Sequence, residues 1–141
     1  DGSLVLIAAS HGGTFALPYV WKHPEKVSGY VSVAADTSFL TGKTGSKDVP
    51  LLTIYGSFDP LLQMQKEVHK PFFPKWQNKI IQDAPHQCYL KDVKAARYFS
   101  TLVKDFVAGK ATEEVKVVAR KSSNPTTEKD RSESLLQDQA A

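Results

Sequence analysis

Four short apolar stretches, separated by segments with helical patterning, constrain the fold of this chain more than any other feature of its sequence. They are Leu4 to Ala9, Tyr30 to Ala35, Leu51 to Tyr55 and Lys79 to Gln82. Their β-branched residues and the Gly, Pro or Asp residues that bound them predict strands. Strands that alternate with helices form a mostly parallel sheet with helices on both faces, so we expect an α/β fold. Chemistry is expected at the carboxyl ends of such strands.

Three segments between and after these strands have the pattern of helices. Gly12 to His23 has an apolar face that ends before Pro24, and Pro18 inside it is expected to kink the helix or to confine its regular part. Leu61 to His69 also has a helical pattern, and Val93 to Val107 is amphipathic. The apolar stripe of the last helix comprises positions 95, 96, 99, 102, 103, 106 and 107.

The composition is that of one globular domain followed by a polar tail. Of the 141 residues, 41% are hydrophobic and 23% are charged, which is typical of a soluble globular protein. Residues 111 to 141 contain no aromatic side chain and are predicted to be mostly disordered. Because the chain enters a core strand within three residues of Asp1, we interpret residues 1 to 110 as the C-terminal half of a larger domain whose N-terminal strands are missing.

Several classes of protein are disfavoured by the sequence. The longest apolar run, Leu4 to Ala9, is far shorter than the ~20 residues that cross a bilayer, and no basic segment precedes it as in a signal peptide. The formal charge of +3 is spread as single lysines, so a nucleic-acid partner is not expected. The single cysteine, Cys88, excludes an internal disulfide and favours a reducing, cytoplasmic location. Because metal-ligand spacing is lacking, we expect neither a metal nor a bound cofactor.

A serine at the end of the first predicted strand is the candidate nucleophile. Ser10 is followed by a helical segment and has small residues two positions before and after it, Ala8 and Gly12. Such small neighbours are needed in a nucleophile elbow, a sharp strand-to-helix turn that holds a serine in a strained backbone conformation. Because Ala8 replaces the usual first glycine, the pattern alone leaves a second interpretation open, in which Ser10 only caps the helix.

An acid and a histidine follow later strands. Asp59 comes after the third strand in a Gly-x-x-Asp-Pro turn, and His86 comes after the fourth strand. Serine, acid and histidine in this order are typical of a hydrolase triad, and in a parallel sheet the three turns lie at one edge. His86 would take the Ser10 proton while Asp59 orients the imidazole. The backbone N–H of His11 is the expected donor to the developing oxyanion.

Other residues compete for these roles. Asp36 follows the second strand, where some hydrolases place their acid, and it is the alternative acid. Cys88 lies near the histidine as an alternative thiol nucleophile, although a lone cysteine is more often a small buried hydrophobe. His23 and His69 are interpreted as helix-terminal or surface groups. Trp76 is interpreted as a packing residue in a loop, with a pocket beside it as the alternative.

Three segments resemble a known family. "LIAASHGGTFALPYVWKHPEKVSGYVSVA" is similar to the nucleophile elbow, helix and following strand of α/β-hydrolases, and "YGSFDP" and "HQCYL" resemble the acid and histidine turns of the α/β-hydrolase domain-containing protein 14 group. The resemblance covers residues 1 to about 108. It implies a partial α/β-hydrolase fold and a serine hydrolase or acyl-transfer enzyme that acts on a small ester, amide or thioester. For the B-type member, it implies protein-lysine deacetylation with coenzyme A as the acyl acceptor.

A noncatalytic role is the alternative from another class of function. A hydrolase-like scaffold can serve as an interaction module, because a fold does not by itself determine an activity. In the hydrolase architecture, the second oxyanion donor comes from a loop after an early strand, which is upstream of the nucleophile. We therefore expect the 141 residues alone to be inactive.

Overall fold

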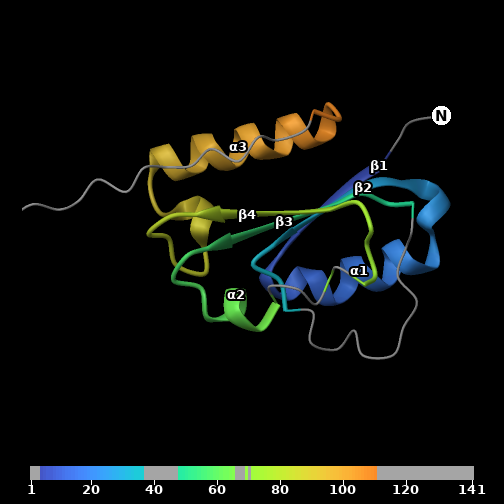
Figure 1. Ribbon diagram of the computed structural model, residues 1–141, viewed down its shortest axis with the longest axis horizontal. Coiled ribbons are helices and arrows are strands. Elements are labelled where there is room, and N and C mark those ends of the chain that lie inside the picture. Colours follow the sequence, from blue (N-terminus) through green and yellow to red (C-terminus); the bar gives the residue numbers. More distant parts are fainter. Residues whose placement is uncertain (1–3, 37–47, 66–68, 70, 111–141) are drawn as a thin grey trace, which may run out of the picture.

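Four parallel strands form one sheet in the part of the chain that the structure describes (Figure 1). The computed structural model describes residues 4–36, 48–65, 69 and 71–110. The strands lie side by side in chain order and are β1 (Leu4–Ala9), β2 (Val27–Val33), β3 (Leu51–Gly56) and β4 (Trp76–Ile81). The prediction of a parallel α/β sheet is confirmed. Because all four strands run in one direction, the segments that follow them leave from the same edge.

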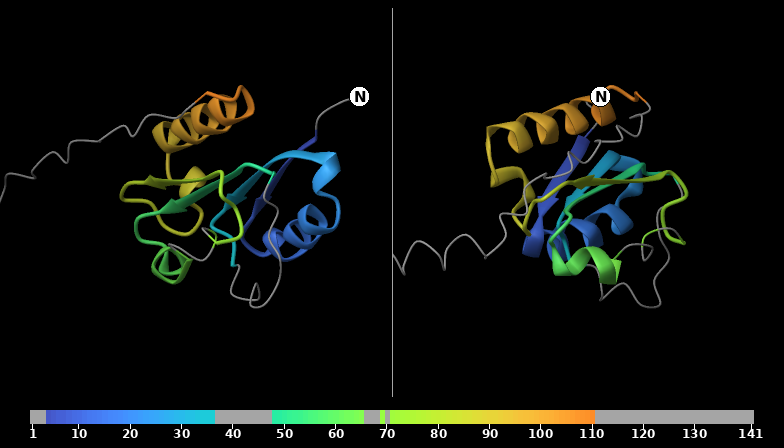
Figure 2. Two further views of the ribbon diagram at one scale, coloured as in Figure 1. Left: turned by 45° about the vertical axis from the view of Figure 1, so that its right-hand side comes forward. Right: turned by 60° about the vertical axis from the view of Figure 1, so that its left-hand side comes forward.

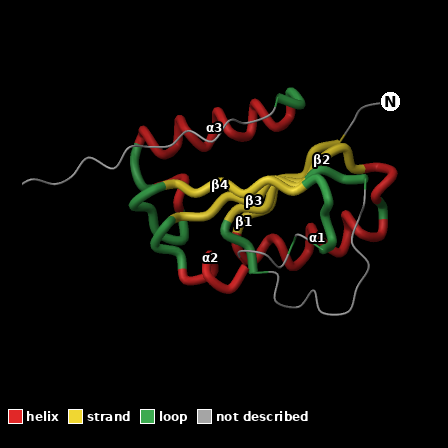
Figure 3. Tube along the Cα trace, viewed as in Figure 1, coloured by secondary structure: helices red, strands yellow, loops and turns green. Residues whose placement is uncertain are grey.

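Helices cover both faces of this sheet. Figures 2 and 3 show α1 (Gly13–Lys22) and α2 (Pro60–Gln65) on one face and α3 (Val93–Val107) on the other. Short 3₁₀ turns follow β1, precede β2 and precede α3, and they are η1 (Ser10–Gly12), η2 (Pro24–Lys26) and η4 (Cys88–Leu90). None of the described helices is long and apolar enough to span a membrane. The predicted tail, residues 111 to 141, lies outside the described residues, so the domain division at residue 110 stays a prediction.

Alternating side chains of the strands fill a core on each face of the sheet, as the period of two along a strand requires. In β3, Leu52 and Ile54 face α3, whereas Leu51 faces α1. The core under α3 includes Val31, Val33, Leu52, Ile54, Ile81, Leu102 and Phe106. The core under α1 includes Leu17, Val20, Tyr30, Leu51 and Phe73. Residues Leu51 to Gly56 are all buried, and β3 is an interior strand from which the next turn leaves the sheet.

Two strands begin earlier than the apolar pattern predicted. β2 begins at Val27 rather than Tyr30, and β4 begins at Trp76 rather than Lys79. Trp76 is therefore the first residue of a strand and not part of a loop. Its Nε1–H donates to Thr53 Oγ1 at 2.9 Å, and Thr53 Oγ1 also donates to Asn78 Oδ1 at 2.9 Å. These bonds pair the polar groups of Trp76 and Asn78 with β3. The start of β4 was not predicted because its polar residues interrupt the apolar pattern.

The helices follow the predicted pattern with local exceptions. α1 continues through Pro18 to Lys22, so Pro18 does not end the regular part of the helix, and its ring is exposed. α3 has the predicted bounds and begins after Asp92, whose side chain accepts a hydrogen bond from Ala95 N at 2.7 Å. Two positions of its predicted apolar stripe, Ala96 and Val107, are exposed. The stripe is thus narrower than predicted, because only one side of α3 contacts the sheet.

Candidate active site

Ser10 occupies the turn between β1 and α1 with a backbone conformation that serine rarely adopts. Its φ is +48°, in the left-handed region, and it is the first residue after β1. Strain of this kind persists only where the surrounding structure enforces it, and it clusters at functional sites. The turn projects the Ser10 hydroxyl from the carboxyl edge of the sheet, as expected for a nucleophile elbow.

The close packing around this turn depends on Gly13 more than on Gly12. A Cβ added to Gly13 would lie 2.6 Å from the Cβ of Ala35, in the segment after β2. A Cβ added to Gly12 would meet the nearest atom, Ala8 Cβ, at 3.8 Å, which is an ordinary contact. Gly13 therefore lets the first turn of α1 sit directly against the segment that follows β2. In the sequence, this contact is indicated by the second glycine of the Gly12-Gly13 pair. The prediction of the elbow relied on Ala8 and Gly12 and did not consider Gly13.

The structure brings Ser10, His86 and Asp59 into one chain of hydrogen bonds. Ser10 Oγ lies 2.8 Å from His86 Nε2, and His86 Nδ1 lies 3.0 Å from Asp59 Oδ2. The Asp59 side chain is completely buried, whereas the His86 side chain is 35% exposed. The interpretation of Ser10 as a helix cap does not fit, because the residue that precedes η1 is Ala9 and the Ser10 hydroxyl contacts the imidazole.

Asp59 is held by the turn that follows β3. Its backbone N–H donates to Gly56 O at 3.1 Å, and its Oδ1 accepts from Leu61 N at 2.9 Å. With Oδ1 used in this way, Oδ2 is directed at His86 Nδ1. A buried carboxylate in this position fixes which imidazole nitrogen carries the proton, so that Nε2 can accept a proton from Ser10.

The turn that carries His86 packs against the turn that carries Asp59. Phe58 N donates to Ala84 O at 3.0 Å. A Cβ added to Gly56 would overlap the carbonyl oxygens of Ala84 and Pro85. Gly56 thus lies directly beneath the residues that precede His86, and no larger residue fits without moving them.

Replacing Gly56 with alanine is therefore expected to displace the histidine turn. Misplacement of catalytic groups by about 1 Å can lower a rate by roughly 10²-fold, and we expect a loss of at least this size in kcat. The measurement is steady-state hydrolysis of an activated ester by the full-length protein, meaning this chain together with any residues that precede or follow it naturally. Gly12→Ala is the matched comparison, because its added Cβ makes only an ordinary contact, and it should cost less. An equal loss in both variants would contradict the role given to the Gly56 contact.

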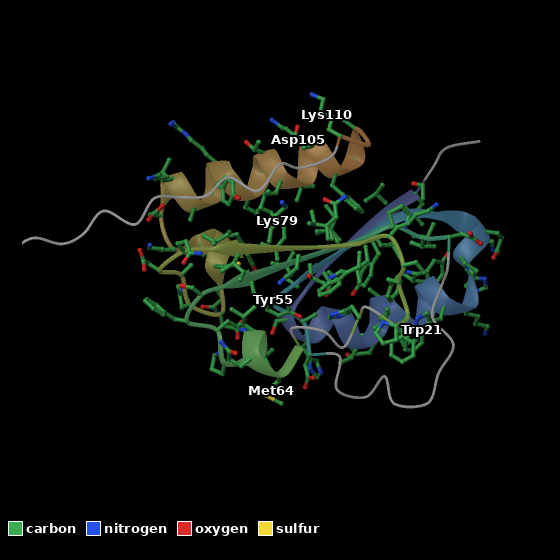
Figure 4. The ribbon with its side chains drawn as sticks, in the orientation of Figure 1. Trp21, Tyr55, Met64, Lys79, Asp105 and Lys110 are labelled. Carbon is green, nitrogen blue, oxygen red and sulfur yellow. The ribbon has the colours of Figure 1, made fainter. Side chains whose placement is uncertain are left out.

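The remaining candidates occupy different positions. Asp36 follows β2 and is half-buried, and it lies near Tyr55, which Figure 4 places between the sheet and α2. Burial raises the pKa of Tyr55, and the carboxylates of Asp59 and Asp36 raise it further. The acid at hydrogen-bond distance from His86 Nδ1 is Asp59 and not the alternative acid, Asp36. His11 is exposed, and the role of its backbone N–H stays a prediction.

Two histidines differ in their surroundings. His23 follows the last residue of α1, with its Nδ1 3.8 Å from Glu25 Oε1, so its interpretation as a helix-terminal group is confirmed. His69 is fully buried, and its ring centroid lies 6.1 Å from that of Trp76, so its interpretation as a surface group was wrong. Trp76 also borders an open hollow of about 380 Å³ at the opposite end of β4 from His86, and a binding role for this hollow stays a prediction.

Cys88 is buried in the core under α3, which agrees with its interpretation as a small hydrophobe. Burial raises its pKa from 9.0 to about 11, so the reactive thiolate at pH 8 is about 100-fold rarer than for an ordinary thiol. We expect native Cys88 to react with a thiol reagent at least this much more slowly than the denatured chain. Reaction should accelerate as the pH rises towards 11. Rapid modification of the native protein at pH 8 would contradict this burial.

Among the described residues, no group of three or more His, Cys, Asp or Glu side chains could hold a metal ion. The arrangement at the carboxyl edge instead consists of a hydroxyl, an imidazole and a buried carboxylate in series. Such a series can transfer a proton from the hydroxyl to the imidazole and stabilise the resulting imidazolium. It can therefore generate an oxygen nucleophile at a strand end without a metal.

No family model matches the chain. Among curated proteins, it is 33% identical over 94 residues to ABHD14B of Rattus norvegicus, a protein whose proposed role is protein-lysine deacylation; the match covers 63% of this chain and 43% of that protein. It is 29% identical over 98 residues to ABHD14A of Mus musculus, over 64% of this chain and 38% of that protein. The chain thus spans less than half the length of these relatives.

Solved structures share the fold. A predicted CIB-like hydrolase from Thermoplasma acidophilum superposes with a TM-score of 0.66 at 23% identity, over 76% of this chain and 51% of that chain. The dienelactone hydrolase of Anabaena variabilis gives a TM-score of 0.65 at 22% identity, over 77% of this chain and 50% of that chain. The carboxylesterase CesB of Bacillus subtilis gives 0.59 at 16% identity, over 77% and 61%. At these identities, the comparison establishes the fold alone.

Proposed function

This chain has part of an α/β-hydrolase fold and is a relative of the ABHD14 group, and from this premise we propose that it forms the catalytic part of a serine hydrolase or acyl-transfer enzyme. The observation that carries the proposal is the hydrogen-bonded series from Ser10 through His86 to the buried Asp59. The positive φ of Ser10 at a strand end supports it, because a helix cap requires no such strain. The substrate class is a small ester, amide or thioester.

In the proposed first half-reaction, Ser10 Oγ attacks the carbonyl carbon of the substrate. His86 Nε2 accepts the proton from Oγ as the new C–O bond forms, and the carbonyl electron pair moves to the oxygen. The backbone N–H of His11 donates to this oxyanion. When the oxyanion collapses, the bond to the leaving group breaks and His86 returns its proton to that group. Asp59 stabilises the imidazolium that exists between these two proton transfers.

In the second half-reaction, the acyl group leaves Ser10. Water or another acceptor loses a proton to His86 and attacks the acyl-serine, after which the proton returns to Ser10 Oγ. An acyl-lysine is one substrate included in the proposal, because the relative ABHD14B has a proposed role in protein-lysine deacylation. Coenzyme A is included as an acyl acceptor on the same resemblance alone. The proposal needs no metal, and it assigns the protein to the cytoplasm because its lone thiol is free and buried.

Covalent labelling tests the proposal directly. A fluorophosphonate, which reacts with activated serines, is incubated with the full-length protein, and the modified peptide is identified by mass spectrometry. We expect stoichiometric modification of Ser10 and loss of ester hydrolysis in parallel. Absence of labelling in a folded protein would favour the noncatalytic interaction module. Labelling confined to another serine would refute the role of Ser10.

The edge of the sheet suggests how the 141 residues behave alone. In the described sheet, β1 pairs with β2 on one side, and Leu4 and Ile7 remain 41% and 53% exposed. An exposed apolar edge strand promotes association between chains. We therefore expect the 141-residue chain to self-associate in size-exclusion chromatography. We also expect it to be inert towards p-nitrophenyl acetate, because the second oxyanion donor of a hydrolase comes from a loop upstream of the nucleophile. A monomer that reacts stoichiometrically at Ser10 would contradict this prediction.

A further inference from the structure

The turns that carry Asp59 and His86 are joined beyond the end of the β3–β4 ladder. The ladder register ends where Gly56 pairs with Ile81. Asp59 lies three residues beyond Gly56, and His86 lies five residues beyond Ile81. Chain segments that leave a sheet in this way can diverge unless further contacts hold them together. Here the distance of 3.0 Å between His86 Nδ1 and Asp59 Oδ2 depends on the relative position of the two turns.

Three hydrogen bonds continue the connection between the turns. Ser57 N donates to Ile81 O at 3.0 Å, and Phe58 N donates to Ala84 O at 3.0 Å. Between them, Asp83 N donates to the side-chain oxygen of Ser57 at 2.8 Å. Of these three bonds, only the last depends on a side chain. The backbone of Ser57 therefore contacts the last residue of β4, and its hydroxyl contacts the histidine turn.

The residue that Ser57 holds is itself in a strained conformation. Asp83 has a φ of +53°, in the left-handed region, and it lies three residues before His86. Aspartate tolerates this region better than most residues, but the conformation still requires support from its surroundings. The hydrogen bond from Asp83 N to Ser57 Oγ supplies such support within the turn that follows β4.

We propose that Ser57 is a positioning residue, which holds the histidine turn in register with the acid turn and so sets the contact between Asp59 and His86. The inference rests on the proposed function, because the effect of Ser57 is measured through proton transfer at His86. Ser57 lies two residues before Asp59 and acts on His86 through Asp83. Its hydroxyl thus couples the orientation of the imidazole to the end of β3.

Ser57→Ala in the full-length protein tests this role. We expect kcat for ester hydrolysis and the rate of fluorophosphonate labelling to fall about 10- to 100-fold, since small displacements of a catalytic group have effects of this size. KM should stay within about twofold, because the lost interaction concerns proton transfer and not substrate binding. Ser57→Thr keeps an oxygen acceptor and should restore kcat to within about threefold of the parent. Ser28→Ala is the matched control, because it removes an exposed hydroxyl that also bonds to the backbone, at Leu4 O.

A double-mutant comparison separates positioning from a loss of stability. If Ser57 acts through the contact of Asp59 with His86, then Ser57→Ala should cost less than about threefold in an Asp59→Asn background, because effects of groups that act as a unit are not additive. A loss that stays at its full size in that background, or a threonine variant as impaired as the alanine variant, would overturn the inference. If Ser57→Ala does not fold, Ser57→Cys replaces the oxygen by a weak acceptor of similar size and gives the same comparison.

The outcome also distinguishes the inference from the proposed function. If the parent protein is neither labelled nor active, the proposed function fails, and with it the consequence expected for Ser57. If the parent is labelled at Ser10 and active, but Ser57→Ala keeps kcat within about threefold of the parent, the proposed function stands and the positioning role is refuted.

Discussion

Ser10→Ala is expected to lower the turnover of the full-length protein by about 10⁶-fold, the cost of removing a nucleophile that acts with a histidine and an acid. The hydroxyl oxygen would form the bond to the acyl group. Among the described residues of the hydrogen-bonded series, no other side chain has a hydroxyl that could replace it. Ser10 is only partly buried, so its loss should leave the fold intact. Activity is measured by ester hydrolysis, and folding is measured by circular dichroism and thermal melting.

Ser100→Ala serves as the control for this variant, because Ser100 is an exposed serine on α3, on the opposite face of the sheet from α1. It should retain the activity and the labelling of the parent. Residual activity of Ser10→Ala within tenfold of the parent would refute the nucleophile assignment. The melting temperature distinguishes a loss of catalysis from unfolding, because a lost nucleophile leaves the melting temperature unchanged.

Asp59→Asn is expected to lower kcat by about 10⁴-fold, as the corresponding change does in serine proteases, where it permits the wrong imidazole tautomer. In this structure the carboxylate accepts from both Leu61 N and the imidazole, and the side chain is completely buried. An amide of the same size can orient its oxygen towards Leu61 N, which directs its NH₂ towards His86 Nδ1. The imidazole would then carry its proton on Nε2 and could not accept one from Ser10.

Asp36→Asn is the matched change for the alternative acid. We expect a small effect on kcat, because Asp59 and not Asp36 is at hydrogen-bond distance from His86 Nδ1. Steady-state kinetics of both variants at several substrate concentrations gives the comparison. A loss at Asp36 alone would reverse the assignment, and comparable losses at both positions would show that both carboxylates contribute.

The features that could be predicted from the sequence are those set by local pattern. Short apolar runs with β-branched residues located the four described strands, and the turn residues after them located Ser10, Asp59 and His86, which the parallel arrangement then brings to one edge. The catalytic roles of these residues stay predictions. Their spatial proximity could be expected because in a parallel sheet the end of every strand faces the same way.

The features that could not be predicted depend on contacts between distant segments. The first half of β4 contains Gln77 and Asn78, which lack the strand pattern and are ordered by pairing with β3. The burial of His69 likewise depends on its packing near Trp76. The need for glycine at position 56 arises from carbonyl groups of Ala84 and Pro85, about 28 residues away in the sequence. No local propensity carries this information.

The parallel order of the strands has a consequence for how the molecule folds. Every neighbouring pair is joined by a crossover segment, and the Ser10–His86 contact joins residues 76 positions apart. Contacts between residues so distant in sequence carry a large entropic cost of closing the chain, and proteins rich in them fold slowly. Helices such as α3 can form early because their contacts are local, whereas the hydroxyl and the imidazole meet only when β1, β3 and β4 have aligned. Reactivity of Ser10 would therefore report the last stage of folding, and an intermediate with native helix content would still be chemically silent.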